Sequence, residues 1–249
     1  MRLLTYNIHK GFSVGNRRFT LETIRHALHQ IEADIVFLQE VRGRSDRHPL
    51  PLGDIEGTAQ FEYLADQLWP HHAYGKNAIY RSGHHGNAIL SSYPFAEWEN
   101  INVSNRRYAS RSLLHGVIDP PAMGRLHLIC VHLGLFEGER RSQLQRLVAR
   151  IRSHVPDGEA LIIAGDFNDW RKQANEYLCG ELGLTDLYAA QHGHAARTYP
   201  VWRPLLAVDR IYGRGLDPGE CHRLHGKPWT GLSDHLPLLA EFSMNGLGR

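Results

Sequence analysis

The sequence predicts a layered α/β domain with β-sheet in its centre. Amphipathic helical patterns recur among many short apolar runs of strand length, which is typical of this class. A globular chain of 249 residues buries about 70–75% of the surface that its unfolded form exposes, so it needs no disulfide or structural metal to hold it together. We expect a single domain over residues 1–249, because the Pro- and Gly-containing stretch at residues 42–57 has the character of a long loop rather than of a linker.

The start of the chain predicts a strand, a helix and a second strand in succession. Residues 2–8 are strand-like, and apolar residues at three- and four-residue spacing predict a helix over residues 20–32. The apolar run 35–38 predicts a strand that leads directly into Glu40. A short helix that Pro70 stops comes after the long loop. A carboxylate is therefore expected at the exit of the second strand.

The rest of the chain predicts strands and helices in mixed order. Further strands, several of them separated by Gly or Pro turns, are predicted around Tyr74 and over residues 87–90, 101–103, 113–118, 126–132, 161–164, 207–212 and 236–242. A strong helix is predicted from about Glu137 to Val155, with a polar face of arginines, including Arg140 and Arg150, that we expect to be solvated. A helix over residues 170–182 and a loop containing His192 and His194 are also predicted.

Charge and cysteine usage narrow the class of protein. The formal net charge of +2 gives no strong basic field, which argues against sequence-independent wrapping of duplex DNA but leaves room for a local basic cleft. Cys130, Cys179 and Cys221 show no Cys-x-x-Cys spacing, so we expect reduced thiols in a cytoplasmic protein. Strand-like sequence from Arg2 leaves no room for an export signal, and no apolar run is long enough for a transmembrane segment.

The run Gly165-Asp166-Phe167-Asn168-Asp169 follows a buried strand and is the most informative motif of the chain. Asp166 and Asn168 are two residues apart and point to the same side of an extended segment, and Gly165 allows the backbone to turn there. A reactive carboxylate can be displayed in this way at a strand end. The alternative is a simple turn and helix cap, for which the same residue types are ordinary choices.

Asp166 and Asn168 belong to a larger set of polar residues that occupy the same class of position, at the ends or starts of strands. These are Asn7, Glu40, His132, Asp166, Asn168, Asp209, Asp234 and His235. Each alone has an ordinary interpretation as a cap, a turn residue or a hydrogen-bonded buried group. If the strand ends share one rim, they form an acidic pocket with two imidazoles that a cation or charged substrate must compensate. Oxygen ligands of this kind suit Mg²⁺ or Mn²⁺.

Several other chemistries lack their motif in this sequence. There is no Gly-x-x-x-x-Gly-Lys-Ser/Thr phosphate loop and no Gly-x-Ser-x-Gly elbow. Cys221-His222 with His225 lacks the second half of a structural zinc site. We interpret His71-His72 and His84-His85 as loop or surface histidines rather than ligands.

The ordered motifs of the chain resemble those of the endonuclease/exonuclease/phosphatase superfamily, the deoxyribonuclease I-like fold, and in particular its small stand-alone bacterial members. They are Thr5-Tyr6-Asn7-Ile8-His9, Leu38-Gln39-Glu40-Val41, Gly86-Asn87-Ala88-Ile89-Leu90-Ser91, Val131-His132-Leu133-Gly134, Gly165-Asp166-Phe167-Asn168, Asp209-Arg210-Ile211 and Ser233-Asp234-His235. The resemblance implies a four-layered α/β sandwich in which two mixed sheets face each other and helices cover the outside. It is specific for the superfamily but much less so for the substrate.

The resemblance also implies a role for each motif residue in metal-dependent phosphoester hydrolysis. Glu40 would be the principal metal ligand, with Asn7 and Asp234 in support. Asp166 would orient or deprotonate the attacking water with help from Asn168, Asp209 would hold His235, and His132 would donate toward a phosphoryl oxygen. Arg111 matches a phosphate-contacting position, and Asn87 is a second candidate phosphate contact. Whether Asp166 or the Asp209–His235 pair accepts the proton of the water stays open at this point.

Three functions remain possible from the sequence. A phosphodiesterase acting on nucleic acid comes first, followed by an enzyme for a phospholipid headgroup or a small phosphorylated metabolite, and then by a non-catalytic binding protein. No protein partner can be inferred. The loop at residues 42–57, with Arg42, Arg44, Arg47 and His48 close behind Glu40, is our candidate for substrate selection.

Overall fold

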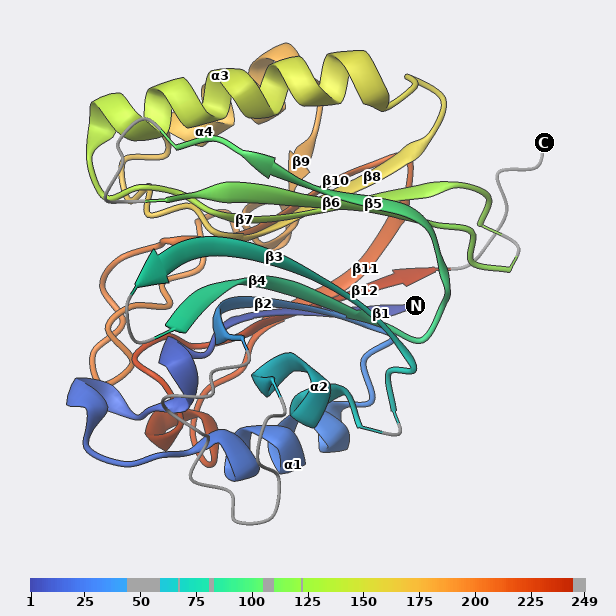
Figure 1. Cartoon of the computed structure of the whole chain (residues 1–249). Helices are drawn as coiled ribbons and strands as arrows, with labels where there is room; N and C mark the ends of the chain where they lie inside the picture. Colours follow the sequence, from blue (N-terminus) through green and yellow to red (C-terminus); the bar gives the residue numbers. More distant parts are fainter. Residues whose placement is uncertain (44–58, 67, 81–82, 105–109, 122, 244–249) are drawn as a thin grey trace.

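Two β-sheets face each other and helices cover both outer surfaces (Figure 1). The computed structural model describes residues 1–43, 59–66, 68–80, 83–104, 110–121 and 123–243. Helices α1 (Leu21–Ile31) and α2 (Gln60–Ala65) cover one side, and α3 (Glu137–His154) covers the other. This arrangement confirms the predicted four-layered α/β sandwich.

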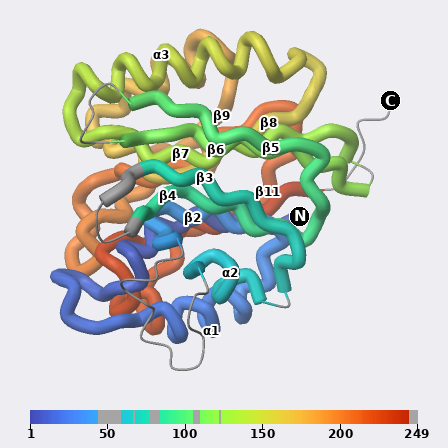
Figure 2. The backbone as a smooth tube through the Cα atoms, viewed as in Figure 1, coloured from blue at the N-terminus to red at the C-terminus, as the bar shows by residue number. Residues whose placement is uncertain are grey.

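The first sheet has six strands in the order β11-β12-β1-β2-β4-β3. Their bounds are β1 Arg2–Asn7, β2 Ile35–Arg42, β3 His71–Tyr80, β4 Gly83–Ser91, β11 Asp217–Arg223 and β12 Leu238–Ser243. Strands β1 and β2 are parallel and α1 connects them, whereas the other neighbours are antiparallel. The first and last strands of the chain lie side by side in the middle of this sheet (Figure 2).

The second sheet also has six strands, in the order β5-β6-β7-β8-β10-β9. Their bounds are β5 Phe95–Asn102, β6 Ser112–Ile118, β7 Leu126–His132, β8 Ala160–Asp166, β9 Thr185–Asp186 and β10 Asp209–Arg214. Strands β7 and β8 are parallel and α3 connects them. The shorter elements are η1 His9–Gly11, η2 Val14–Asn16, α4 Gln173–Asn175, η3 Glu176–Glu181, α5 Leu187–His192 and η4 Trp229–Gly231.

The core between the sheets is built from the inward faces of their central strands. Leu3 and Phe37 from the first sheet belong to the same buried cluster as Leu114, Leu128 and Ile162 from the second, and none of the five is exposed to solvent. Two further clusters lie under α1 with α2 and under α3. Strands buried on both faces are predominantly apolar, which explains the apolar runs in β2, β7 and β8.

Strand register places three motif residues next to one another. His132 at the end of β7 pairs with Asp166 at the end of the parallel strand β8, and Asp209 at the start of β10 pairs with Asp166 from the other side. In the first sheet, the register between β2 and β4 shifts between Leu38 and Val41, and Glu40 there has a φ of 58°. The fold therefore gathers residues far apart in sequence at one end of both sheets.

Some local predictions were wrong. His192 and His194 do not share a loop, because His192 is the last residue of α5. His71, His72, His84 and His85 lie in strands β3 and β4 rather than in loops, and His72 is exposed as a surface histidine. Strand β11 was not predicted because it is a polar edge strand that contains Pro and Gly and exposes most of its residues. The predicted helix over residues 170–182 is shorter and divided into α4 and the π-helical turn η3.

Arg140 also departs from its prediction as a solvated residue of α3. Its side chain is 1% exposed and donates hydrogen bonds to the carbonyl oxygens of Gly134 and Leu135. The three cysteines are unpaired, as predicted. Within the described ranges, no helix combines the length and apolar character needed to cross a membrane.

Gly165 is needed because the backbone of β7 passes close to it. Its φ is +143°, and a Cβ atom added there would lie 2.0 Å from the carbonyl oxygen of Val131. We expect Gly165→Ala to lower the free energy of unfolding by at least about 2 kcal/mol, because it combines a disfavoured backbone conformation with a backbone clash. Urea denaturation would measure this loss. Gly138→Ala is the matched control, since a Cβ there meets nothing within 4 Å; equal stability of the two variants would contradict the expectation.

Buried His115, outside the strand-end cluster, is expected to make stability depend on pH. His115 Nδ1 accepts from Arg150 Nε at 3.1 Å, and His115 Nε2 lies 2.9 Å from His127 Nδ1, so His115 is a neutral imidazole with its proton on Nε2. Burial and the nearby Arg150 lower the pKa of His115 to about 3. The unfolded chain therefore binds a proton at His115 at higher pH than the folded chain does. The free energy of unfolding is highest above pH 6.5 and decreases as the pH falls from 6.5 toward 3.

We expect this histidine to account for about 2 kcal/mol of the stability difference between pH 7 and pH 5. His115→Gln should flatten that part of the profile of unfolding free energy against pH, measured by urea denaturation. His225→Gln, at an exposed position, is the control and should leave the profile unchanged. An unaltered slope in His115→Gln would contradict the assignment.

Candidate active site

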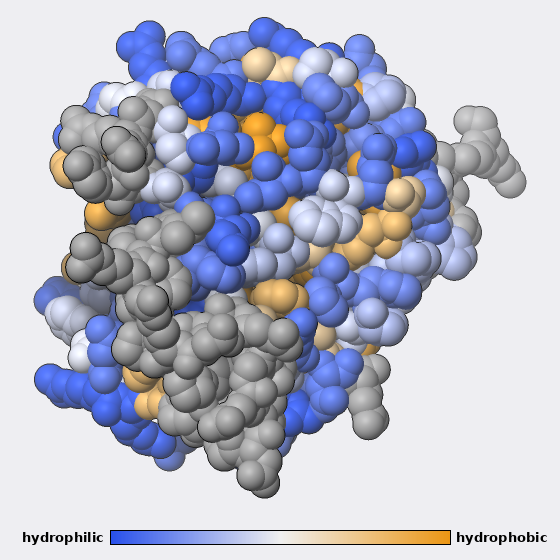
Figure 3. Space-filling view, viewed as in Figure 1, coloured by the Kyte–Doolittle hydropathy of each residue, from blue (hydrophilic) through white to orange (hydrophobic). Residues whose placement is uncertain are grey.

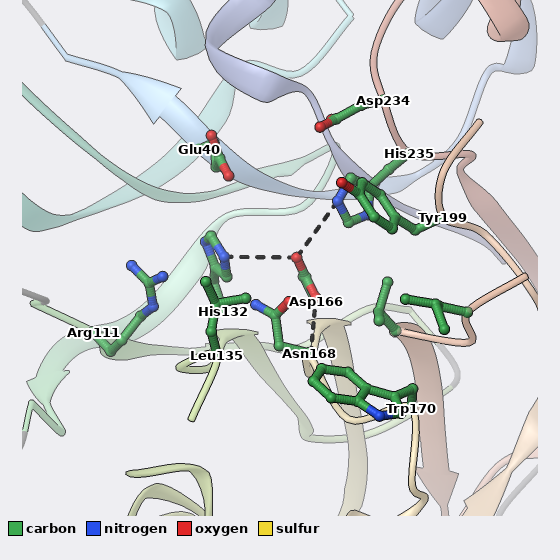
Figure 4. A pocket seen from close by; sticks show the side chains of 12 residues that line it. Glu40, Arg111, His132, Leu135, Asp166, Asn168, Trp170, Tyr199, Asp234 and His235 are labelled. Atoms are coloured by element: carbon green, nitrogen blue, oxygen red, sulfur yellow. Dashed lines mark hydrogen bonds and ion pairs between the residues drawn. The ribbon is translucent and has the colours of Figure 1, made fainter. Parts of the chain in front are cut away.

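A pocket of about 280 Å³ opens where the strand ends of the two sheets converge (Figure 4). Its lining combines charged groups on one side with apolar side chains on the other. The lining residues are Glu40, Arg111, His132, Leu135, Asp166, Asn168, Trp170, Tyr199, Leu206, Val208, Asp234 and His235. Seven of the ten predicted site residues are among them: Glu40, Arg111, His132, Asp166, Asn168, Asp234 and His235.

Asp166 lies at the centre of the polar side, between two imidazoles (Figure 4). One carboxylate oxygen, Oδ1, accepts from the backbone N–H of Asn168 at 2.9 Å. The other, Oδ2, accepts from Asn7 Nδ2 at 3.1 Å and lies 3.6 Å from His132 Nε2 and 3.8 Å from His235 Nε2. Asp166 is 1% exposed, so these contacts fix the direction of its carboxylate.

Asp209 holds His235 in place on the far side of the pocket. Its Oδ2 lies 2.8 Å from His235 Nδ1 and accepts from Thr198 Oγ1 at 2.5 Å. The His235 backbone N–H donates to Ser233 Oγ at 3.3 Å, which steadies the turn that carries the imidazole. With Nδ1 bound to the carboxylate, Nε2 of His235 points toward Asp166 and the pocket.

Burial and charge shift the pKa values of these groups in different directions. Burial raises the pKa of Asp166, and the neighbouring Asp209 adds to the rise, although His235 opposes it. Burial works against a charged His235, but attraction to Asp209 outweighs it and raises the pKa of His235. Burial and Arg111 lower the pKa of His132 well below its usual range. The pocket therefore contains one imidazole that favours the charged form and one that favours the neutral form.

Asn168 and Arg111 are positioned through the same backbone carbonyl. Asn168 Nδ2 donates to the oxygen of Leu133 at 2.9 Å, and Arg111 Nε donates to it at 3.3 Å. Asn168 has a φ of 49°, which Asn tolerates better than most residues. Both side chains line the pocket, so a guanidinium is available beside the imidazole of His132.

The two predicted metal-binding carboxylates that line the pocket each face a cationic or titratable side chain of η1. Glu40 Oε2 lies 3.1 Å from Lys10 Nζ, and Asp234 Oδ1 lies 3.6 Å from His9 Nδ1. Burial opposes ionisation of Glu40, but attraction to His132, where that imidazole is protonated, and to the ammonium group of Lys10 outweighs it and lowers the pKa of Glu40 to about 2. Glu40 is therefore a carboxylate at neutral pH.

Three predicted site residues do not line the pocket. Asn7 and Asp209 lie behind it and act on lining residues, Asn7 through Asp166 and Asp209 through His235. Asn87 is fully buried, and its amide donates across the sheets to the carbonyl oxygens of Ser112 at 3.2 Å and Cys130 at 3.5 Å. A role for Asn87 in phosphate binding stays a prediction.

The donor set of the pocket suits a hard divalent cation. Glu40 and Asp234 supply carboxylate oxygens on the same side of the pocket. The amide oxygen of Asn7, the third predicted ligand, accepts from the backbone N–H of His9 at 3.1 Å. A separate group, Asp166, Asp209 and His235, offers ligand atoms within 4.8 Å of one another, but hydrogen bonds already join Asp209 and His235. The residues present therefore fit a metal of the magnesium type better than a thiolate-bound zinc.

Sequence reasoning missed several contributors. Thr198, which supports Asp209, and Lys10, which faces Glu40, carry no motif of their own, although Lys10 follows Asn7 closely enough to have been suspected. The apolar lining residues Leu135 and Trp170 each follow a motif residue by two or three positions, which was an unused signal. Most of the loop proposed for substrate selection, residues 44–57 of the predicted 42–57, lies outside the described residues.

Comparison with known proteins adds to this geometry. Residues 4–235 match the model of the Endonuclease/Exonuclease/phosphatase family. The chain is 46% identical to YbhP of Escherichia coli K12, a protein described as uncharacterized, over 98% of this chain and 96% of that one. This identity extends over almost the full length of both proteins.

Solved structures share the fold at lower identity. An endonuclease/exonuclease/phosphatase from Beutenbergia cavernae superimposes with a TM-score of 0.80 at 21% identity, covering 99% of this chain and 72% of that one. A humanized D. rerio TDP2 gives a TM-score of 0.70 at 19% identity, with 98% of each chain covered. Since the family match spans nearly all of the chain and includes the strand ends that form the pocket, this protein belongs to the endonuclease/exonuclease/phosphatase family.

Proposed function

We propose that residues 1–249 form a single catalytic domain that hydrolyses phosphodiester bonds with the help of a divalent metal ion. Members of the family are typically metal-dependent hydrolases that act on phosphate esters. The observation that carries the proposal is the Asp166 carboxylate, fixed by Asn7 and Asn168 between two imidazoles at the pocket. A water held by this carboxylate would be aligned for attack on phosphorus.

The metal in this proposal is Mg²⁺ or Mn²⁺, held by Glu40 and Asp234 with support from Asn7. When bound, it would stabilise the negative charge that develops on the oxygens of the phosphoryl group. The low pKa of Glu40 keeps this ligand ionised, and ionised oxygen ligands are what such a cation requires. In the absence of metal, Lys10 balances the charge of Glu40.

In this proposal, each polar side chain of the pocket has a separate role in the reaction. Asp166, with its raised pKa, would accept the proton of the attacking water. His235 is better suited to stabilise charge than to act as the base, because Asp209 favours its protonated form. His132 and Arg111 would donate hydrogen bonds to the phosphoryl oxygens. Of the two bases left open by the sequence, the proposal therefore favours the Asp166 carboxylate over the Asp209–His235 pair.

Arg111→Ala should raise KM for a phosphodiester by about tenfold to a hundredfold, because a hydrogen bond to a charged group is lost. We expect a smaller effect on kcat, since Arg111 does not contact the attacking water in this proposal. Steady-state kinetics with bis-nitrophenyl phosphate would measure both constants. Arg146→Ala, an exposed arginine on α3, is the control, and an unchanged KM in Arg111→Ala would contradict the phosphate-binding role.

A substrate panel tests the proposal as a whole. The purified protein would be assayed with bis-nitrophenyl phosphate, nitrophenyl phosphate, plasmid DNA, RNA and phospholipid, each with Mg²⁺ or Mn²⁺ and with chelator. Metal-dependent cleavage of the diester above the monoester is the expected result. Turnover that is equal in chelator, or ligand binding without turnover of any ester, would refute it.

The natural substrate has two candidate classes. Nucleic acid is the first, in line with the nuclease-like motifs of the sequence, and it should show steep salt dependence. A phospholipid headgroup is the second, and a specific observation favours it: Leu135, Trp170 and Leu206 form an apolar wall directly beside the charged groups of the pocket. We further propose a cytoplasmic location, since the cysteines are unpaired and two of the three are buried as thiols.

A further inference from the structure

Exposed apolar side chains are concentrated around the mouth of the pocket. Among the described residues, eight large hydrophobic side chains are exposed, and five of them lie in three loops: the turn after β7, the turn after β8 and the turn at residues 199–206. We call these five the apolar rim: Leu135, Phe136, Trp170, Trp202 and Leu205. Such a concentration is unusual for a surface that faces only water.

The three loops meet at the pocket. Leu135 and Trp170 line it from the second sheet, and the turn at 199–206 contributes Tyr199 and Leu206 from its two ends. Leu206 N donates to the carbonyl oxygen of Tyr199 at 2.8 Å, which closes this turn and projects its middle outward. Trp202 and Leu205 in that turn are 71% and 52% exposed. The apolar rim therefore belongs to the loops that border the apolar side of the pocket.

The buried side chain of Arg140 supports two residues of the apolar rim. The buried guanidinium of Arg140 lies 5.1 Å from the ring centroid of Trp170 and donates to the carbonyl oxygen of Leu135. This contact connects the turns after β7 and β8 through one side chain of α3. Leu135 and Trp170 nevertheless remain 58% and 42% exposed, so they are fixed in position with much of their apolar surface still uncovered.

Positive charge accompanies the apolar side chains. Arg171 and Lys172 follow Trp170, and Arg203 follows Trp202, and all three are exposed. Glu137, the exposed first residue of α3, pairs with Arg171 at 2.9 Å. The coloured part of the face shown in Figure 3 is mostly hydrophilic, with orange atoms in groups between the blue ones.

We propose that the apolar rim docks this protein on an anionic lipid bilayer, so that the pocket receives a phosphodiester of a phospholipid headgroup. Tryptophan, leucine and phenylalanine beside basic residues are the side chains that insert at a lipid interface and bind anionic headgroups. A single-stranded nucleic acid is less well matched, since the leucines cannot stack with bases and a groove that follows its backbone needs more cations. The choice of substrate depends on the proposed phosphoesterase function, whereas the docking does not.

Vesicle flotation tests the docking. The protein would be mixed with vesicles of phosphatidylcholine containing phosphatidylglycerol, or of phosphatidylcholine alone, at low and high salt. We expect the protein to bind the anionic vesicles, and we expect high salt to weaken this binding. The double variant Trp202→Ala/Leu205→Ser should bind about tenfold or more weakly, because it removes apolar side chains that enter the interface. Trp98→Ala, which removes another exposed tryptophan from β5, is the matched control and should bind as the wild type does.

Two further measurements distinguish the outcomes. Brominated lipids should quench the fluorescence of the wild type, and Trp202→Ala should lose more of this quenching than Trp98→Ala. Failure of the wild type to float with anionic vesicles, or equal flotation of the double variant, would overturn the proposal. Shielding of the rim by a single-stranded oligonucleotide without vesicle binding would overturn it in favour of nucleic acid.

The chemistry is followed separately with bis-nitrophenyl phosphate, which is soluble in water. Vesicle binding without hydrolysis of this ester would leave the docking intact and refute the proposed function. Hydrolysis of the ester without vesicle binding would support the proposed function and refute the docking.

Discussion

His235→Ala is expected to lower kcat for a phosphodiester by about 10²–10⁴-fold without unfolding the protein. The imidazole lies 2.8 Å from Asp209 and 3.8 Å from Asp166, and the pocket opens directly beside it. In the proposed reaction, its loss would remove a charged donor at the place where negative charge develops during attack on phosphorus. The side chain is 7% exposed in the native protein, so circular dichroism and urea denaturation should accompany the kinetics.

Two further variants test this expectation, one as a control and one through the charge of His235. His194→Ala, at an exposed position after α5, is the control and should retain wild-type turnover. Asp209→Asn keeps the size of the side chain that supports His235 but removes the charge that raises the pKa of the imidazole. In that variant, His235 should lose its proton at lower pH, and turnover should fall on the basic side of a pH profile where the wild type still works. Full activity of a folded His235→Ala protein would eliminate the assignment.

The polar site could be predicted because its members mark the ends of apolar strands. Asp166 follows a strand buried on both faces, and a run of that kind has one probable place in a layered domain, the middle of a sheet. Strands that are parallel and adjacent end on the same side, so His132 and Asp166 had to meet. The sequence could not show that Asn87, in an equally regular strand, faces the neighbouring sheet rather than the pocket.

The residues that could not be predicted from the sequence lie in the loops and in the first turn of α3. Arg140 has the helical spacing of a solvated arginine, yet the carbonyl oxygens of the preceding turn and the ring of Trp170 bury it. The exposed side chains of residues 199–206 belong to an irregular turn that has no periodic pattern. Loop conformation depends on such tertiary contacts rather than on local propensity, so neither the support of the rim nor its position could be deduced.

Glu40→Gln is expected to weaken the affinity for Mg²⁺ by at least about 100-fold, because even residues that only support a metal ligand change affinity by 10–100-fold. The substitution preserves size and removes the charge that the low pKa of Glu40 maintains at neutral pH. Isothermal titration calorimetry would measure binding directly, and the dependence of turnover on Mg²⁺ concentration would measure it in the working enzyme. Glu97→Gln changes an exposed carboxylate on β5 and provides the control.

Lys10 makes this expectation specific to the position of the metal. Its ammonium group lies 3.1 Å from Glu40 Oε2, and a divalent cation at Glu40 would have to displace it against charge repulsion. Lys10→Met should therefore strengthen Mg²⁺ binding while Glu40→Gln weakens it. Opposite shifts from two neighbouring residues cannot arise from a general loss of structure, which would weaken binding in both. Mg²⁺ affinity that is unchanged in both variants would place the metal elsewhere in the pocket, and the group of Asp166, Asp209 and His235 would then be the next site to test.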